Sequence, residues 1–229
     1  MVGGSARTSL GTFAIFFGIG LFILLRGKSN DTYAGILVLY IALLQLFDYG
    51  IWNDPDCVPG GSNDRGTRGL YIFLWLMPAV LCLAASFFAT NLFADPASRY
   101  LLIGAAAGFG LLALVLATFM YEDKATWCTV PGKMWQPNYY FLHVPKNIMT
   151  PNFILLIGLL LPTIIVDPKM LGAGTIAIML GSYVISRRFD PDKDGEWLSA
   201  NTSFANLIAI WALLVPAIRH DLFGTDGTY

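Results

Sequence analysis

The stretch Leu43-Leu-Gln-Leu-Phe-Asp-Tyr-Gly-Ile-Trp52 decides how this chain folds. It closes the apolar segment Tyr33–Trp52, which has the roughly 20 residues that a helix needs to cross hydrocarbon. Asp48 lies inside this segment, where an ionised side chain is costly unless it has a partner or a purpose. Gln45 and Trp52 share a helical face with Asp48, because residues three and four apart are neighbours on a helix.

Six further apolar stretches flank this segment. The expected spans are about 10–25, 33–52, 70–93, 99–121, 149–166, 170–186 and 198–218. These runs are continuous rather than alternating, which favours helices over a membrane barrel. Charged residues make up 13% of the chain, about half the share in soluble domains, and no basic tract indicates a nucleic-acid partner. We predict an all-α fold: one domain, residues 1–229, built as a polytopic bundle of seven transmembrane helices.

An odd number of spans places the two termini on opposite sides of the membrane. We call the N-terminal side face A, which carries the long connections, and the other side face B. Cys57 and Cys128 belong to two different face A loops. A disulfide between them requires that face A meets an oxidising compartment, and the alternative is two free thiols in a reducing one. On the disulfide interpretation, the N-terminus and the long loops lie on the extracytoplasmic or lumenal side. Cys82, within the third span, is expected to be a small packing residue.

Asp48 lies about one turn from the face A end of its helix. A negative charge near a helix C-terminus opposes the helix dipole, so a nearby cation would compensate it. Basic residues at the same depth occur before the fifth span and after the sixth. The predicted polar cluster consists of Gln45, Asp48, Trp52, Lys146, Arg187 and Arg188. We interpret it as a polar lock between helices, with an ion or proton site and a water-facing acid as alternatives.

A second acidic motif, Asp190-Pro-Asp-Lys-Asp-Gly195, lies between the sixth and seventh spans on face A. Its D-x-D-x-D-G spacing is typical of the first half of a calcium loop. Asn201 takes the twelfth position, where that motif has a bidentate glutamate. A calcium site and a solvated acidic turn are both compatible with this pattern. The tentative calcium ligands are Asp190, Asp192, Asp194 and Glu196.

Several chemistries lack the residues that they require. Retinal needs a Schiff-base lysine inside a span, and none of the seven predicted spans contains a lysine. The two histidines, His143 and His220, lie toward opposite faces, so they do not form a metal hydrolase site. The chain also shows no c-type haem motif and no glycine-rich phosphate loop. We therefore expect a protein that is not an enzyme, requires no cofactor and contains no retinal.

The segment Gln45–Trp52 resembles a group of uncharacterised seven-helix membrane proteins of bacteria and giant viruses, which carry Gln-x-x-Glu-x-x-x-Trp at the end of the second span. This chain has Asp48 at the position of that glutamate. The loop Trp127-Cys-Thr-Val-Pro-Gly-Lys133 is similar to a Trp-Cys…Gly-Lys segment of the viral members. Trp197 stands where they show Trp-Cys, but the cysteine is missing here. The resemblance implies seven helices and a face A cluster around Asp48, and it implies no activity.

Three functional hypotheses follow. The first is a structural or accessory component of a membrane assembly, which contacts the lipid bilayer and other membrane subunits or a second copy of itself. The second is a small ion or solute channel or transporter that uses Asp48. The third is a receptor-like sensor whose acidic loop binds an ion. Small residues that predict close helix contacts are Gly104, Gly108, Gly110, Gly172, Gly174 and Gly181.

Overall fold

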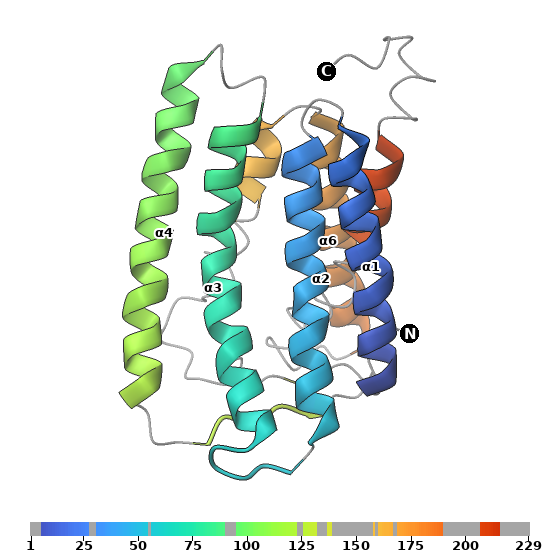
Figure 1. Cartoon of the computed structure of the whole chain (residues 1–229), viewed down its shortest axis with the longest axis vertical. Coiled ribbons are helices and arrows are strands. Elements are labelled where there is room, and N and C mark those ends of the chain that lie inside the picture. Colours follow the sequence, from blue (N-terminus) through green and yellow to red (C-terminus); the bar gives the residue numbers. More distant parts are fainter. Residues whose placement is uncertain are drawn as a thin grey trace.

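The computed structural model describes residues 6–27, 31–54, 56–89, 95–122, 126–131, 137–138, 158, 160–166, 169–189 and 207–215. Its elements are α1 (Ala6–Arg26), α2 (Asp31–Asn53), α3 (Ser62–Phe88), α4 (Pro96–Glu122), β1 (Val130–Pro131), β2 (Pro137–Asn138) and α6 (Lys169–Phe189). Residues 160–165 and 207–215 are also helical. The helices stand side by side as an upright bundle, with the turn between α2 and α3, on face A, at the bottom of Figure 1.

Four helices are long and apolar enough to cross a membrane, namely α1, α2, α3 and Pro96–Met120 of α4. They confirm the first four expected spans and define a multi-pass integral membrane protein. The described residues show four spans, not the seven that we predicted. The apolar part of α6, Lys169–Ser182, is shorter than the roughly 20 residues that a span requires. The fifth expected span is described only at residues 158 and 160–166, and the seventh only over residues 207–215.

Small residues let α1 and α2 approach closely. A methyl group added at Gly35 would lie 2.6 Å from Leu24 Cγ, and one at Gly20 would lie 2.8 Å from Leu39 Cγ. Helices in lipid associate through such close packing, because lipid tails are as apolar as the side chains. The antiparallel pair α1–α2 therefore depends on two glycines that our prediction did not name.

The six predicted glycines divide into two groups. Gly172 lies against the backbone of Thr163, and Gly174 lies against the Trp211 indole, whose Nε1 donates to Met170 O at 2.9 Å. These contacts confirm close packing around α6. The remaining predictions are wrong for the described part of the chain, where Gly104, Gly108 and Gly181 have no neighbour and Gly110 makes only an ordinary contact.

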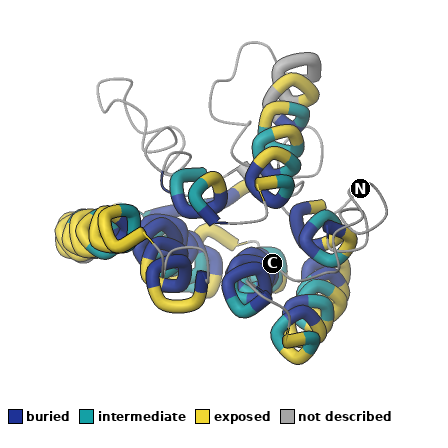
Figure 2. Tube along the Cα trace, turned by 90° about the horizontal axis from the view of Figure 1, so that it is seen from above, coloured by how far each residue is buried: buried dark blue, intermediate teal, exposed yellow. Residues whose placement is uncertain are grey.

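The apolar core has two layers. The layer toward face B joins Ile23, Leu37 and Leu81 with Ile208, and it contains the free, buried Cys82, which confirms the packing role expected for that residue. The layer toward face A joins α2, α3 and α4 with Trp127. Figure 2 shows α4 at the edge of the bundle with its outer side exposed. The helices α2 and α3 therefore form the interior, and α1 and α4 lie at the rim.

A salt bridge closes the face B ends of α1 and α2. Arg26 donates from Nε to Asp31 Oδ2 at 2.7 Å and from Nη2 to Asp31 Oδ1 at 2.5 Å, and its Nη1 donates to Leu213 O at 3.2 Å. Arg26 ends α1 and Asp31 begins α2, so each charge also complements its own helix dipole. Gly27, at φ 69°, supplies the left-handed residue that ends α1. One guanidinium thus links three helical segments.

The start of α4 is capped by Asp95. Asp95 accepts hydrogen bonds from Ser98 Oγ at 2.5 Å and from Ser98 N at 3.4 Å, as a helix-capping carboxylate does. These bonds, the side-chain one first, lower the pKa of Asp95 below its usual value. Pro96 occupies the first helical position, where its missing N–H costs nothing.

Candidate functional site

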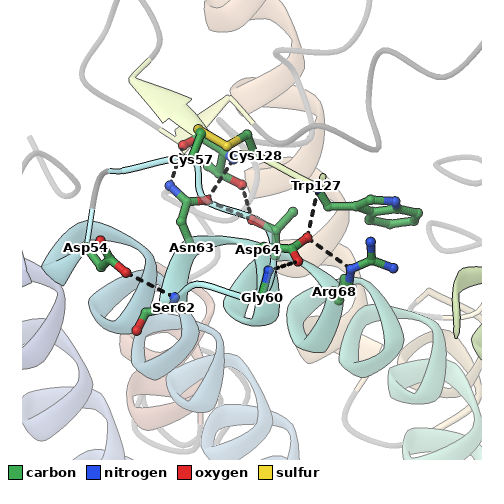
Figure 3. The surroundings of a disulfide bond; sticks show 11 residues. Asp54, Cys57, Gly60, Ser62, Asn63, Asp64, Arg68, Trp127 and Cys128 are labelled. Atoms are coloured by element: carbon green, nitrogen blue, oxygen red, sulfur yellow. Dashed lines mark hydrogen bonds and ion pairs between the residues drawn. A yellow bond between two sulfur atoms is a disulfide. The ribbon is translucent and has the colours of Figure 1, made fainter. Parts of the chain in front are cut away.

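The polar residues of face A form a cap over the ends of α3 and α4, drawn in Figure 3. We define the face A cap as residues 56–61, the first two turns of α3 (Ser62–Gly69) and the segment 126–130. Cys57 and Cys128 are joined by a disulfide with their Cα atoms 5.6 Å apart, which confirms the predicted bridge. The bridge connects the α2–α3 turn to the chain that follows α4, 71 residues apart in sequence.

A side-chain amide docks the segment after Cys128 onto α3. Asn63 Nδ2 donates to Thr129 O at 2.9 Å, and Thr129 N donates to Asn63 Oδ1 at 2.9 Å. The amide therefore pairs with the backbone of Thr129 as a neighbouring strand would. Thr67 Oγ1 lies 2.7 Å from Thr129 Oγ1, and all three residues are buried. The docked backbone has both of its polar groups satisfied.

Asp64 is the centre of a second set of contacts. It accepts hydrogen bonds from Gly60 N at 2.9 Å, Trp127 N at 2.8 Å and Arg68 Nε at 3.0 Å. The carboxylate lies in the first turn of α3, where the helix dipole favours a negative charge. One buried acid therefore fixes the turn before α3, the segment after α4 and its own helix.

Arg68 extends this network to α4. Its Nη1 donates to Met120 O at 2.6 Å, in the last turns of α4, and its guanidinium lies 5.3 Å from the Trp127 ring centre. A cation at a helix C-terminus and over an indole face is favourable in both positions. The Trp127 ring also meets Tyr71 edge-on at 5.2 Å, and this contact continues the cap into the apolar layer below it.

The turn before α3 is held by its own contacts. Gly60 has φ 73°, a left-handed conformation that glycine adopts at no steric cost. Gly61, the N-cap residue just before α3, makes no side-chain capping bond, and Asp54 accepts the Ser62 N–H at 3.0 Å in its place. The acid at the end of α2 thus satisfies an N–H that the start of α3 leaves open.

The cap changes one sequence-based prediction. We assigned residues 53–69 to a loop and began the third span at residue 70, but α3 begins at Ser62. The all-α prediction is confirmed, and the chain after the disulfide adds only a small antiparallel pair of two-residue strands, in which Val130 pairs with Asn138. The i,i+4 spacings Asn63–Thr67 and Asp64–Arg68 indicated a polar start of the helix that we did not recognise.

The predicted cluster around Asp48 is described in part. Gln45 and Asp48 are 2% and 4% exposed, and Asp48 takes part in a polar interaction. Arg187 and Arg188 occupy the last turn of α6, at the same face as Asp48, and their side chains are not among the described ones. Lys146 and the tentative calcium ligands Asp190, Asp192, Asp194 and Glu196 lie outside the described residues. Their contacts with Asp48 and with calcium stay predictions.

The polar groups of the cap are engaged with one another and with α4. The polar side chains of Asn63, Asp64, Thr67 and Arg68 all bond to other parts of the cap or to α4. Within the described residues, no three His, Cys, Asp or Glu side chains come together as a metal site. The cap therefore immobilises three chain segments at one end of the bundle.

Fold and site together define a multi-pass integral membrane protein with a disulfide-clamped cap on one face. No protein-family model, curated protein or solved structure matches the chain.

Proposed function

We propose that this protein is a structural or accessory component of a membrane assembly, and that it is not an enzyme and requires no cofactor. The observation that carries this proposal is the face A cap, in which a disulfide, two backbone-like amide bonds and a partly buried ion pair fix one rigid surface. A surface held in this way can be presented to a partner with little loss of conformational entropy on binding. Such a surface suits assembly better than turnover.

We further propose that the three remaining apolar segments, 149–166, 170–186 and 198–218, also cross the membrane. Their described parts are helical, and Ile208 and Leu171 belong to the same core layer as α1 and α2. With seven spans, face A and the N-terminus lie on the extracytoplasmic or lumenal side, where a disulfide persists. A cysteine at the exposed position Ser62 should then react with an impermeant maleimide from outside sealed cells, and one at the exposed position Ala97 should not. The reverse labelling would contradict this orientation.

Inside the membrane, a second surface that we propose for association is the outer side of α4. Leu101, Leu111 and Val115 are exposed there, and Gly104 and Gly108, four residues apart, have no neighbour among the described residues. Two glycines at this spacing let a second helix approach the backbone closely, whether it comes from another subunit or from a second copy. A large residue at Gly108 would therefore block the contact.

The test compares the native size of Gly108→Leu with that of Gly18→Leu. Gly18 is an exposed glycine on α1 that also has no neighbour within 4 Å, so its substitution adds the same bulk at another lipid-facing position. Native electrophoresis and light scattering in mild detergent should show an assembly for the wild-type chain and for Gly18→Leu, and a single chain for Gly108→Leu. A wild-type chain that migrates alone, also after crosslinking in the intact membrane, would refute the proposal.

A further inference from the structure

A cation and an aromatic ring meet between α3 and α4 at face B. The Arg99 guanidinium lies 5.8 Å from the centre of the Phe87 ring, within the range of a cation–π contact. Phe87 belongs to the last turn of α3 and Arg99 to the first turn of α4. Both helices are membrane spans, so this contact lies at the face B boundary of the membrane. Phe87 is 52% exposed, and its free side therefore faces lipid.

A second contact fixes how α3 and α4 run below this pair. A methyl group added at Gly110 would lie 3.9 Å from Ala79 Cβ, deeper in the membrane, and the two helices are antiparallel. Leu83 lies between the two contacts, one turn from the ring of the first, and Ile103 lies one turn from its guanidinium. Residues four apart share a helical side. Leu83 and Ile103 therefore continue the same seam between α3 and α4 into the hydrocarbon.

We define the face B stripe as Leu83, Phe87, Arg99 and Ile103. It has a positive charge at the membrane boundary and apolar side chains below it, of which Leu83 is 41% exposed. Tyr100, next to Arg99, is 72% exposed, as is typical of the aromatic belt at a membrane interface. A small anion would leave the apolar part uncovered, and an apolar partner helix would remove the cation from water at a cost. An amphiphile with an anionic head and acyl chains matches both parts.

The chemistry of Arg99 suits a phosphate. A guanidinium has five N–H donors, so Arg99 can hold phosphate oxygens beside the Phe87 ring and beside the further interaction that it makes. Two of these donors match two oxygens of one phosphate, which makes arginine a specific phosphate ligand. The acid nearest to Arg99 in sequence, Asp95, accepts two hydrogen bonds from Ser98. A lipid phosphate at this boundary therefore meets both a charge and a matching set of donors.

We propose that the face B stripe binds an anionic phospholipid, whose phosphate oxygens accept hydrogen bonds from Arg99 and whose acyl chain lies along the apolar residues of the stripe. This site is independent of the structural role proposed above. Under the orientation proposed there, face B meets the cytoplasmic leaflet, which carries the anionic lipids. At about 100° per residue, Gly108 lies on the opposite side of α4 from Arg99, so a partner helix at Gly108 does not cover the lipid.

The experiment measures, by native mass spectrometry of the full chain in detergent, the binding of phosphatidylglycerol, which is anionic, and of phosphatidylcholine with the same acyl chains. The wild-type chain should bind its first phosphatidylglycerol about fivefold more tightly, the preference that one basic residue at a membrane surface provides. Arg99→Gln should lose this preference, and Arg99→Lys should keep part of it, because a lysine keeps the charge but not the paired donors. Arg65→Gln is the matched control, since it removes the same charge from an exposed position at face A, and it should keep the wild-type preference.

Three results would overturn the proposal. One is equal binding of the two lipids by the wild-type chain. Another is an Arg99→Gln variant that melts at a lower temperature in lipid-free detergent but keeps the wild-type lipid preference, because Arg99 would then only fasten α3 to α4. The third is displacement of the bound lipid by glycerol 1-phosphate, which would assign the site to a soluble phosphate. If Arg99→Gln does not fold, Arg99→Met decides in its place, because methionine keeps a long apolar side chain beside the Phe87 ring.

Discussion

Replacement of Asn63 by alanine is the sharpest test of the face A cap. Asn63 makes two hydrogen bonds of 2.9 Å to the backbone of Thr129, and both residues are buried. Alanine removes both bonds and leaves a buried N–H and a buried C=O without their partner. The loss of a hydrogen bond costs about 1 kcal/mol of unfolding free energy. When the remaining partner is buried and unsatisfied, the cost per bond lies at about 1–3 kcal/mol. The expected loss of unfolding free energy is therefore about 2–4 kcal/mol.

The assay is thermal unfolding in detergent, followed by near-ultraviolet circular dichroism and by tryptophan fluorescence, because Trp127 lies in the cap. For a chain of this size, a loss of about 3 kcal/mol corresponds to a fall in Tm of roughly 6–12 °C. Arg65→Ala is the matched control, since Arg65 is an exposed residue two positions along the same helix. Surface substitutions of this kind usually change stability by less than about 0.5 kcal/mol.

Oxidised and reduced samples of the two variants separate the amide from the disulfide. We expect Asn63→Ala to lower the Tm in both states, because its bonds to Thr129 do not depend on the bridge. A trypsin digest should also cleave the segment after Cys128 sooner in the variant. If Asn63→Ala unfolds at the same temperature as Arg65→Ala, the amide does not dock this segment and our description of the cap is refuted.

Three further predictions concern the clamps and the helix packing. Cys57→Ser opens a loop of 71 residues, which a chain-entropy model values at about 4 kcal/mol, so it should lower the Tm as measured by calorimetry of the non-reduced protein. Arg26→Ala should lower the free energy of unfolding by about 3–5 kcal/mol, because it removes the guanidinium that pairs with Asp31, which is only 3% exposed. In the same assay, Arg26→Lys should be less destabilised than Arg26→Ala, because it keeps a positive charge. Gly35→Leu should prevent the close approach of α1 and α2 and shift the protein into aggregates on size-exclusion chromatography, whereas Gly18→Leu should not.

The sequence predicted those elements that a short stretch of residues specifies by itself. A continuous apolar run identifies a span by length alone, and the first four runs became α1 to α4. The pairing of Cys57 with Cys128 was predictable because both residues fall in loops of the same face. The start of α3 was missed, because a hydropathy criterion begins a helix where polar residues end and does not use the i,i+4 spacing of polar residues. In the structure, Asn63 and Asp64 are helical and buried because the segment after α4 covers them.

The partners of charged residues were harder to predict than their positions. Asp31 and Arg26 are five residues apart, on either side of a turn, and both fall between the predicted spans 10–25 and 33–52. Their pairing depends on how α1 and α2 pack, which is fixed by Gly20 and Gly35 and not by any charge pattern. The bond from Arg26 to Leu213 O spans 187 residues, a separation at which one sequence carries no contact signal. Which charged residues pair therefore depends on how the helices pack, and not on their spacing in the sequence.

The two clamps explain why α2 is the fixed element of the bundle. At face B, Arg26 and Asp31 join its start to α1 and to the helix at 207–215. At face A, Asp54 follows its end and accepts the N–H of Ser62, so the cap begins where α2 stops. By contrast, α4 meets the bundle through α3, whose Arg68 donates to Met120 O, and the outer side of α4 stays exposed. A partner that binds α4 would therefore leave both clamps and the interior of α2 undisturbed.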